Sequence, residues 1–307
     1  MLSYTLRRIA GLVPTLFVLV TLSFFIIRLA PGGPFGQEQI LSPAVRANLN
    51  AAYGLDQPLL VQYGRYLAGV VHGDLGPSLR HRDSRVSELI ADGLPLSLTI
   101  GIAAAVLAFL AGVPLGTYAA WRAESRLARG MLSLSMLGVV LPGFVVGPLL
   151  ALIFGIYWPV LRVGGYESGD PSYLVLPVIT LALPVLAYVA RLMRDSMRDV
   201  LRANYIRTAR AKGLPPRVVL FRHALRPALT PVVSYLGPAT ALVITGSLVV
   251  EAVFGLPGAG RFLVQGAIDR DYTLVMGMVL VYGVFTLVCN LLADLAYGWL
   301  DPRVRLA

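Results

Sequence analysis

The sequence predicts an all-α, polytopic membrane protein with six transmembrane helices, an external helical segment after the first span, and a polar cytoplasmic helix between spans four and five. Of its 307 residues, 57% are hydrophobic and 14% are charged, whereas globular domains carry about a quarter charged residues. Six apolar stretches reach the roughly 20 residues that a membrane helix needs. After the fourth stretch, residues 191–226 hold ten Arg or Lys and only two acids.

The six candidate spans cover residues 9–30, 94–121, 130–157, 173–192, 228–250 and 274–298. Arginines precede the first span and follow the second, fourth and sixth spans. By the positive-inside rule these segments lie in the cytoplasm, which places both chain termini there. A cleaved signal peptide is the alternative for the first span, but its apolar run is longer than such a peptide needs, and residues 28–32 make a poor cleavage site.

The chain divides into residues 1–30 with the first span, an external segment at 31–93, and a five-helix core at 94–307. Proline and glycine signals bound the first two helices expected in the external segment, and Ser42 is the expected N-cap of the first. The three expected helices cover residues 43–53, 58–72 and 84–91. This segment caps the external ends of the spans or docks an external partner, and the two roles are compatible.

The spans are rich in residues that bend helices or let them approach closely. Proline removes a helical hydrogen bond and kinks the helix, which membranes tolerate where neighbouring helices or cavity water satisfy the freed carbonyls. Gly112-x-x-x-Gly116 allows close helix packing. Kinked helices suit a path that opens and closes, and irregular packing is the alternative. The prolines are Pro14, Pro114, Pro142, Pro148, Pro177, Pro184, Pro231 and Pro238.

Residues 204–227 read N-Y-I-R-T-A-R-A-K-G-L-P-P-R-V-V-L-F-R-H-A-L-R-P. The pattern predicts one polar helix, a break at 213–216 and a second short helix. Such a hydrophilic segment has no partner within the bilayer, so it must project into water. Gly213 can adopt a positive φ and end the first helix, and Pro215 and Pro216 prevent it from continuing. A basic face lying on anionic lipid is the alternative to a protein contact.

Several function classes are excluded by what the chain lacks. It contains no GxxxxGK[ST], HExxH or GxSxG motif, so we expect no catalytic, cofactor-binding or metal-binding residues and no enzyme activity. Its net charge of +10 comes mostly from residues 191–226, which speaks against nucleic acid as a partner. The only cysteine, Cys289, lies in an apolar stretch and is expected to pack there. The span cores are nearly free of charge, which disfavours an ion-coupled secondary transporter.

The polar segment resembles the coupling loop of bacterial binding-protein-dependent ABC importer permeases. Their general pattern is Glu-Ala-Ala, three residues, Gly, nine residues, then Ile-x-Leu-Pro. Arg207 and Thr208 replace the first two residues of that pattern, whereas Ala209 and Gly213 match it. R-T-A-R-A-K-G-L followed by R-H-A-L is similar to the variant found in the peptide/nickel subgroup.

The resemblance covers nearly the whole chain. Further similar motifs are R-L-A-P-G-G from Arg28, H-G-D-L-G-P from His72, E-A-V-F-G-L-P-G-A-G from Glu251, and the terminal Asp301-Pro302-Arg303. The subgroup implies an importer of oligopeptides in the bacterial inner membrane, with dipeptide, glutathione and nickel branches left open. A non-transporting membrane receptor or scaffold is the rival from another class.

The resemblance also implies partners and site residues. The partners are a second homologous permease subunit, two cytoplasmic ATPase subunits that bind ATP and Mg, an external substrate-binding protein, the peptide and the lipid membrane. The expected ATPase-coupling contact is Asn204, Tyr205, Thr208, Ala209, Arg210, Lys212, Gly213 and Leu214. The expected external gate or binding-protein contact, for which a compact loop is the alternative, is Glu251, Gly255, Leu256, Pro257 and Gly258. The expected translocation path is Ser234, Tyr235, Thr240, Thr245, Ser247 and Asn290.

Overall fold

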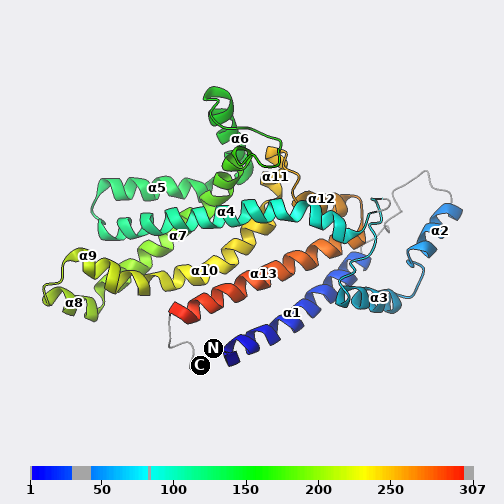
Figure 1. The fold of residues 1–307 in the computed structure, drawn as a ribbon, viewed down its shortest axis with the longest axis horizontal. Helices are drawn as coiled ribbons and strands as arrows, with labels where there is room; N and C mark the ends of the chain where they lie inside the picture. The colour runs from blue at the N-terminus through cyan, green and yellow to red at the C-terminus, as the bar shows by residue number, and fades with distance from the viewer. Residues whose placement is uncertain (1, 30–42, 82–83, 301–307) are drawn as a thin grey trace. The chain divides into compact units, whose positions relative to one another are not determined.

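The computed structural model describes residues 2–29, 43–81 and 84–300, and this part of the chain is helical without a β-strand (Figure 1). The predicted all-α class is confirmed. Ser42 and the motif residues 30–33 and 301–303 lie outside the described residues. The helices are α1 Leu2–Leu29, α2 Pro43–Ala52, α3 Leu59–Val71, α4 Val86–Trp121, α5 Arg126–Val140, α6 Gly143–Ala151, η1 Leu152–Tyr157, α7 Ser172–Arg202, α8 Asn204–Ala211, α9 Pro216–Val218, η2 Val219–Ala224, α10 Leu225–Gly246, α11 Leu248–Phe254, α12 Gly260–Ile268 and α13 Tyr272–Leu300.

Five helices of the described chain are long and apolar enough to cross a membrane, and a bent pair raises the number to six if it crosses as one span. The bent pair corrects the predicted third span at 130–157, because α5 and the α6–η1 helix meet at 110° instead of forming one straight helix. The bend follows from Pro142. Proline disfavours a helical conformation in the residue before it, and Leu141 is extended with ψ 122°.

Three further boundaries differ from the sequence expectation. The short helix expected at 84–91 is the beginning of α4. The second polar helix, expected to be separate, continues through α9 and η2 into α10, so that residues 216–246 form one long helix. The span expected at 228–250 is interrupted at Ser247, where α10 gives way to α11. In each case the apolar pattern alone does not determine whether neighbouring helical segments are continuous or separate.

The chain forms two compact units. Unit 1 comprises residues 1–10, 96–257 and 285–307, and its core is built around α7, which packs against α5 and α10. Glycines permit close approach here, as predicted for Gly112-x-x-x-Gly116. A Cβ at Gly112 would lie 2.8 Å from Val189 Cγ1, and one at Gly116 would lie 2.7 Å from Met193 Cβ.

Unit 2 comprises residues 11–95 and 258–284. The start of α4 packs on α12 and α13, with Val86, Phe262 and Met278 in the core. Asp271, at the start of α13, holds the segment before α4. Its carboxylate accepts hydrogen bonds from the Ser78 hydroxyl and, at 3.1 Å each, from the backbone N–H groups of Leu79 and Leu274. Buried backbone groups of this loop are thereby satisfied.

Candidate functional site

The polar helix α8 is fastened to unit 1 by its apolar side. An extended residue, Ala203 with ψ 149°, separates it from α7. Ile206 is fully buried and Ala209 nearly so, and Leu214 beyond the helix packs on the same core. The spacing of Ile206 and Ala209 places both on one face of a helix. The helix is therefore anchored to unit 1, where it contacts α7 and η2.

The end of α8 has the predicted geometry. Gly213 adopts φ +76°, and its N–H donates to the Arg210 carbonyl at 2.9 Å. Pro215 is extended, and Pro216 begins α9. A Cβ at Gly213 would have no described atom within 4 Å. Glycine is therefore required here by backbone conformation and not by lack of space.

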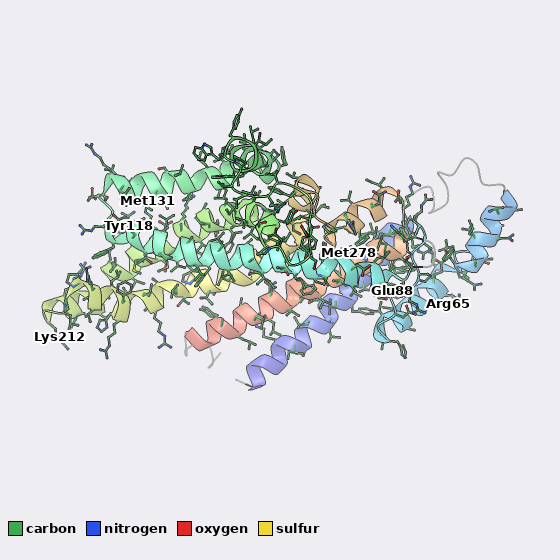
Figure 2. The ribbon with its side chains drawn as sticks, turned by 45° about the horizontal axis from the view of Figure 1, so that its top comes forward. Arg65, Glu88, Tyr118, Met131, Lys212 and Met278 are labelled. Carbon is green, nitrogen blue, oxygen red and sulfur yellow. The ribbon has the colours of Figure 1, made fainter. Side chains whose placement is uncertain are left out.

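Six residues of the expected ATPase-coupling contact lie on an exposed surface. They are Asn204, Tyr205, Thr208, Arg210, Lys212 and Gly213. Lys212 lies at the end of α8 (Figure 2). The other two expected residues, Ala209 and Leu214, turn toward the core and anchor the helix instead of facing outward. Partial burial raises the pKa of Tyr205.

The exposed surface also contains residues outside the expected set. Arg207 on α8 and Phe221 and Arg222 on η2 are exposed, and α8 contacts η2. Phe221 is 62% exposed, although it belongs to a polar segment. An aromatic residue next to Arg222 in a polar segment could have identified this position from the sequence. We define the α8 surface as the exposed residues of α8 and η2, from Asn204 to Arg222.

The expected gate residue Glu251 does not lie in an external loop. It belongs to α11, is 1% exposed, and accepts hydrogen bonds of 2.6 Å from the hydroxyls of Ser97 and Ser247. Glu251 is therefore a buried acid of α11, which lies outside the candidate spans. Ser97, on α4, was missed because a lone serine in an apolar stretch carries no specific signal. The three side chains connect α4 to the break between α10 and α11.

The other expected gate residues form the turn after α11. Gly255 is left-handed with φ +63°, and the N–H of Leu256 donates to the Glu251 carbonyl at 2.8 Å. Leu256 is buried and Pro257 is half-buried. Gly258 belongs to unit 2, where it is buried near Gly93. The predicted tight turn is present, and it leads into α12, a helix that sequence reasoning missed.

The expected path residues do not share one surface. Ser234 is exposed on α10 and Thr245 is half-buried, and the two hydroxyls donate to carbonyls of their own helix. Tyr235 pairs with Tyr188 at a ring-centroid distance of 4.3 Å. Ser247 belongs to the Glu251 cluster. The side-chain oxygen of Asn290 is buried on α13 without a hydrogen-bond partner in the described chain.

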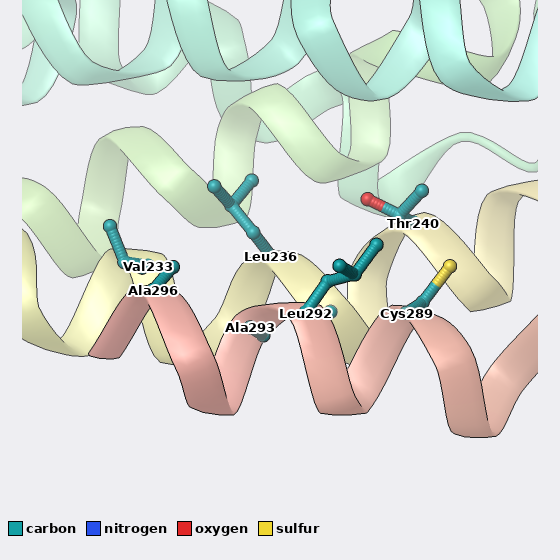
Figure 3. Close-up of a pocket in the computed structure, with 8 residues that line it drawn as sticks. Val233, Leu236, Thr240, Cys289, Leu292, Ala293 and Ala296 are labelled. Carbon is teal, nitrogen blue, oxygen red and sulfur yellow. The ribbon is translucent and has the colours of Figure 1, made fainter. Parts of the chain in front are cut away.

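Thr240 lies elsewhere, in an apolar groove between α10 and α13 (Figure 3). The groove has a volume of about 230 Å³ and is lined by Val233, Leu236, Gly237, Thr240, Cys289, Leu292, Ala293 and Ala296. Cys289 lines it as a small apolar side chain. With one hydroxyl, one thiol and no charge, this lining offers no ligand set for a metal. Within the described ranges, no cluster of three His, Cys, Asp or Glu could hold a metal ion.

Comparison with known families matches almost the entire chain. The family described as "Binding-protein-dependent transport system inner membrane component" matches residues 112–306. The N-terminal part of the binding-protein-dependent transport system membrane component matches residues 1–101.

Similar sequences match this chain over almost its full length and their own. The oligopeptide transport system permease protein OppB of Haemophilus influenzae is 47% identical over 305 residues, covering 99% of this chain and 100% of that protein. OppB of Escherichia coli (strain K12) is 46% identical with the same coverage. The dipeptide transport system permease protein DppB of Bacillus subtilis is 39% identical over 306 residues, covering 100% of this chain and 99% of that protein.

Similar structures are found among ABC transporters. Inward-facing conformations of the MetNI methionine ABC transporter match with a TM-score of 0.54 and 17% identity, covering 70% of this chain and 97% of the other. An amino acid ABC transporter with histidines matches with a TM-score of 0.52 and 18% identity, covering 69% of this chain and 94% of the other. At these identities the likeness concerns the fold alone.

Proposed function

The chain belongs to the family of binding-protein-dependent transport system inner membrane components and is a multi-pass, non-catalytic permease subunit. We propose that it imports oligopeptides as part of an ATP-driven transporter. The observation that carries the proposal is the 47% identity to an oligopeptide permease over the full length of both proteins. An external binding protein delivers the peptide, a second permease subunit completes the path, and two cytoplasmic ATPase subunits bind ATP and Mg.

The α8 surface is the contact for one ATPase subunit. All of its exposed charged residues are basic, which suits acidic groups on a partner, and its exposed Tyr205 and Phe221 add aromatic area of the kind enriched in protein interfaces. Ile206 and Ala209 fix α8 to the core, so a force on the exposed face reaches α7 and α10. Shifting the spans between inward- and outward-facing states from a ratio of 1:99 to 99:1 requires that the ATPase subunit bind one state more tightly by about 5.5 kcal/mol.

The break at Ser247 and the Glu251 cluster belong to the external gate. A helix interrupted at Ser247 can change direction more easily than a continuous one, and the buried carboxylate holds the two sides of the interruption against α4. The exposed stripe of α10 that includes Ser234 and Leu242 lines the path. This stripe is uncharged, so selection among peptide side chains is left to the binding protein.

Peptide uptake tests the proposal. Uptake of labelled tri- to pentapeptides should be lost when the gene is deleted and return when it is restored. The second candidate is dipeptide import, which is favoured by the 39% identity to a dipeptide permease. Loss of dipeptide uptake with normal tri- to pentapeptide uptake would select that branch. Loss of nickel or glutathione uptake alone would overturn both peptide assignments.

A further inference from the structure

A cavity of about 400 Å³ lies in unit 2, between the end of α1, α12 and the start of α13. It is distinct from the α8 surface, from the Glu251 cluster and from the groove between α10 and α13. Its lining residues are Ile26, Ile27, Gly266, Ala267, Arg270, Tyr272 and Val275. The lining is therefore apolar over most of its extent and cationic at Arg270.

The apolar side of the cavity continues into apolar surface on both flanking helices. Ile26 on α1 is 66% exposed and Ile268 on α12 is 63% exposed, and Leu22 and Val264 are exposed beside them. Exposed apolar area of this kind is unfavourable in water, by about 25 cal/mol per Å². In a chain that spans the membrane, these residues are in contact with lipid. A ligand of this cavity accordingly has an apolar part.

The polar end of the cavity lies at the ends of two candidate membrane spans. Arg28 is next to the last residue of the first candidate span, and Tyr272 is the first residue of the last one. The Arg28 guanidinium lies over the ring of Tyr272, which lines the cavity, with its Cζ 5.5 Å from the ring centroid. Its Nε is buried without a hydrogen-bond partner among the described residues. An unsatisfied buried donor of this kind calls for an acceptor.

Arg270 supplies the second cation. It adopts φ +55°, and no other non-glycine residue of the described chain has a positive φ. Such backbone conformations cost free energy and cluster at ligand sites.

We propose that this cavity binds an anionic phospholipid, with the phosphate of the headgroup between Arg28 and Arg270 and an acyl chain along Ile26 and Val275. Arginine suits the phosphate because its planar guanidinium can donate two parallel hydrogen bonds. A free phosphate would use only the cationic end and leave the apolar lining exposed. The inference rests on the membrane location of the chain and does not depend on which peptide is transported.

The test uses the chain purified with its accompanying subunits in nanodiscs that contain equal amounts of phosphatidylglycerol and phosphatidylcholine. Native mass spectrometry measures which lipids stay bound on extraction. We expect phosphatidylglycerol to be retained preferentially. Arg270→Asn removes the charge with a residue that tolerates positive φ, and it should lower phosphatidylglycerol affinity about tenfold, as expected for one lost charge-assisted hydrogen bond. The double variant with Arg28→Gln should abolish the preference.

Arg261→Gln is the matched control, because Arg261 is an exposed arginine of α12 that does not line the cavity. It should retain phosphatidylglycerol like the wild type. Thermal melting of each variant establishes that it is folded. Equal retention of the two lipids, or unchanged retention in a folded Arg270→Asn protein, would overturn the proposal. Displacement of the lipid signal by millimolar inorganic phosphate would also overturn it, in favour of a free-phosphate site.

Discussion

At the scale of single residues, Glu251 has the most unusual environment. A buried carboxylate is costly unless it is hydrogen-bonded, and Glu251 accepts two hydrogen bonds of 2.6 Å from buried serines. Glu251→Ala removes this acceptor, and a buried polar group left unsatisfied costs about 1–3 kcal/mol. We expect a lower melting temperature in detergent and impaired transport. Differential scanning fluorimetry and peptide uptake measure the two effects.

Two variants serve as comparisons for Glu251→Ala. Glu251→Gln keeps the shape and one acceptor oxygen, so its loss of stability should be smaller. Glu167→Ala removes an exposed acid of a loop and should melt like the wild type. If Glu251→Ala also melts and transports like the wild type, then the cluster with Ser97 and Ser247 contributes nothing to the stability of unit 1 or to transport.

Local and long-range features of single residues differed in how well they could be predicted. The positive φ of Gly213 was predictable, because a glycine followed by Pro215 and Pro216 is a local signal. The burial of Glu251 was not, because its partner Ser97 lies 154 positions away in the sequence. The hydrogen bond from Ser78 to the Asp271 carboxylate was missed for the same reason, since the two residues are 193 positions apart.

At the scale of elements, the end of α8 allows a direct test of coupling. Gly213→Val places a β-branched residue at φ +76°, and a left-handed conformation costs an L-residue roughly 1–2 kcal/mol. No described atom crowds the position, so the change should alter the α8 surface without unfolding unit 1. We expect normal membrane insertion and weaker ATPase binding. Co-purification of the ATPase subunits with this chain measures the effect.

The control for this change is Gly213→Asn, because asparagine tolerates the left-handed region. It should bind the ATPase subunits nearly as well as glycine. Normal co-purification and normal uptake for Gly213→Val would mean that the conformation of this turn is not needed for coupling.

Charge on α8 gives a second test at this scale. Arg210 and Lys212 are exposed, so reversing both to Glu should leave the fold intact and place like charges opposite an acidic partner. We expect loss of peptide-stimulated ATP hydrolysis in liposomes. Arg226→Glu, an exposed arginine at the start of α10, is the matched charge reversal outside α8. If the effect of the Arg210/Lys212 reversal depends only on the anionic lipid content of the liposomes, the alternative is supported that the basic face of α8 lies on anionic lipid.

Among the elements, length and apolar composition predicted the location of every candidate span, because both are local properties. The 110° bend between α5 and α6 was not predicted, although Pro142 was noted, since a proline permits many bend angles and the packing selects one. Helix α12 was missed because it has only nine residues. A segment this short can be a helix or a loop until its neighbours are known.

At the scale of the whole molecule, the even number of crossings predicted from the sequence requires both termini to lie on one side of the membrane. The structure of unit 1 is consistent with this, because Arg8 on α1 and Asp294 on α13 form an ion pair of 2.9 Å. The α4–α5 turn and α8 also lie at one end of unit 1 (Figure 1). Which end faces the cytoplasm follows only from the arginine distribution, through the positive-inside rule.

Labelling of single cysteines tests this orientation. In a Cys289→Ser background, Glu124→Cys at the exposed α4–α5 turn should be protected from an impermeant thiol reagent in intact cells and labelled after permeabilisation. Asp56→Cys, exposed between α2 and α3, should be labelled in intact cells. Three arginines retain the α4–α5 turn in the cytoplasm, which places the segment with Asp56 on the opposite side of the membrane. The cysteine-free background protein sets the baseline. Labelling of Glu124→Cys but not of Asp56→Cys in intact cells would invert the topology, and it would remove α8 from the compartment that contains ATP.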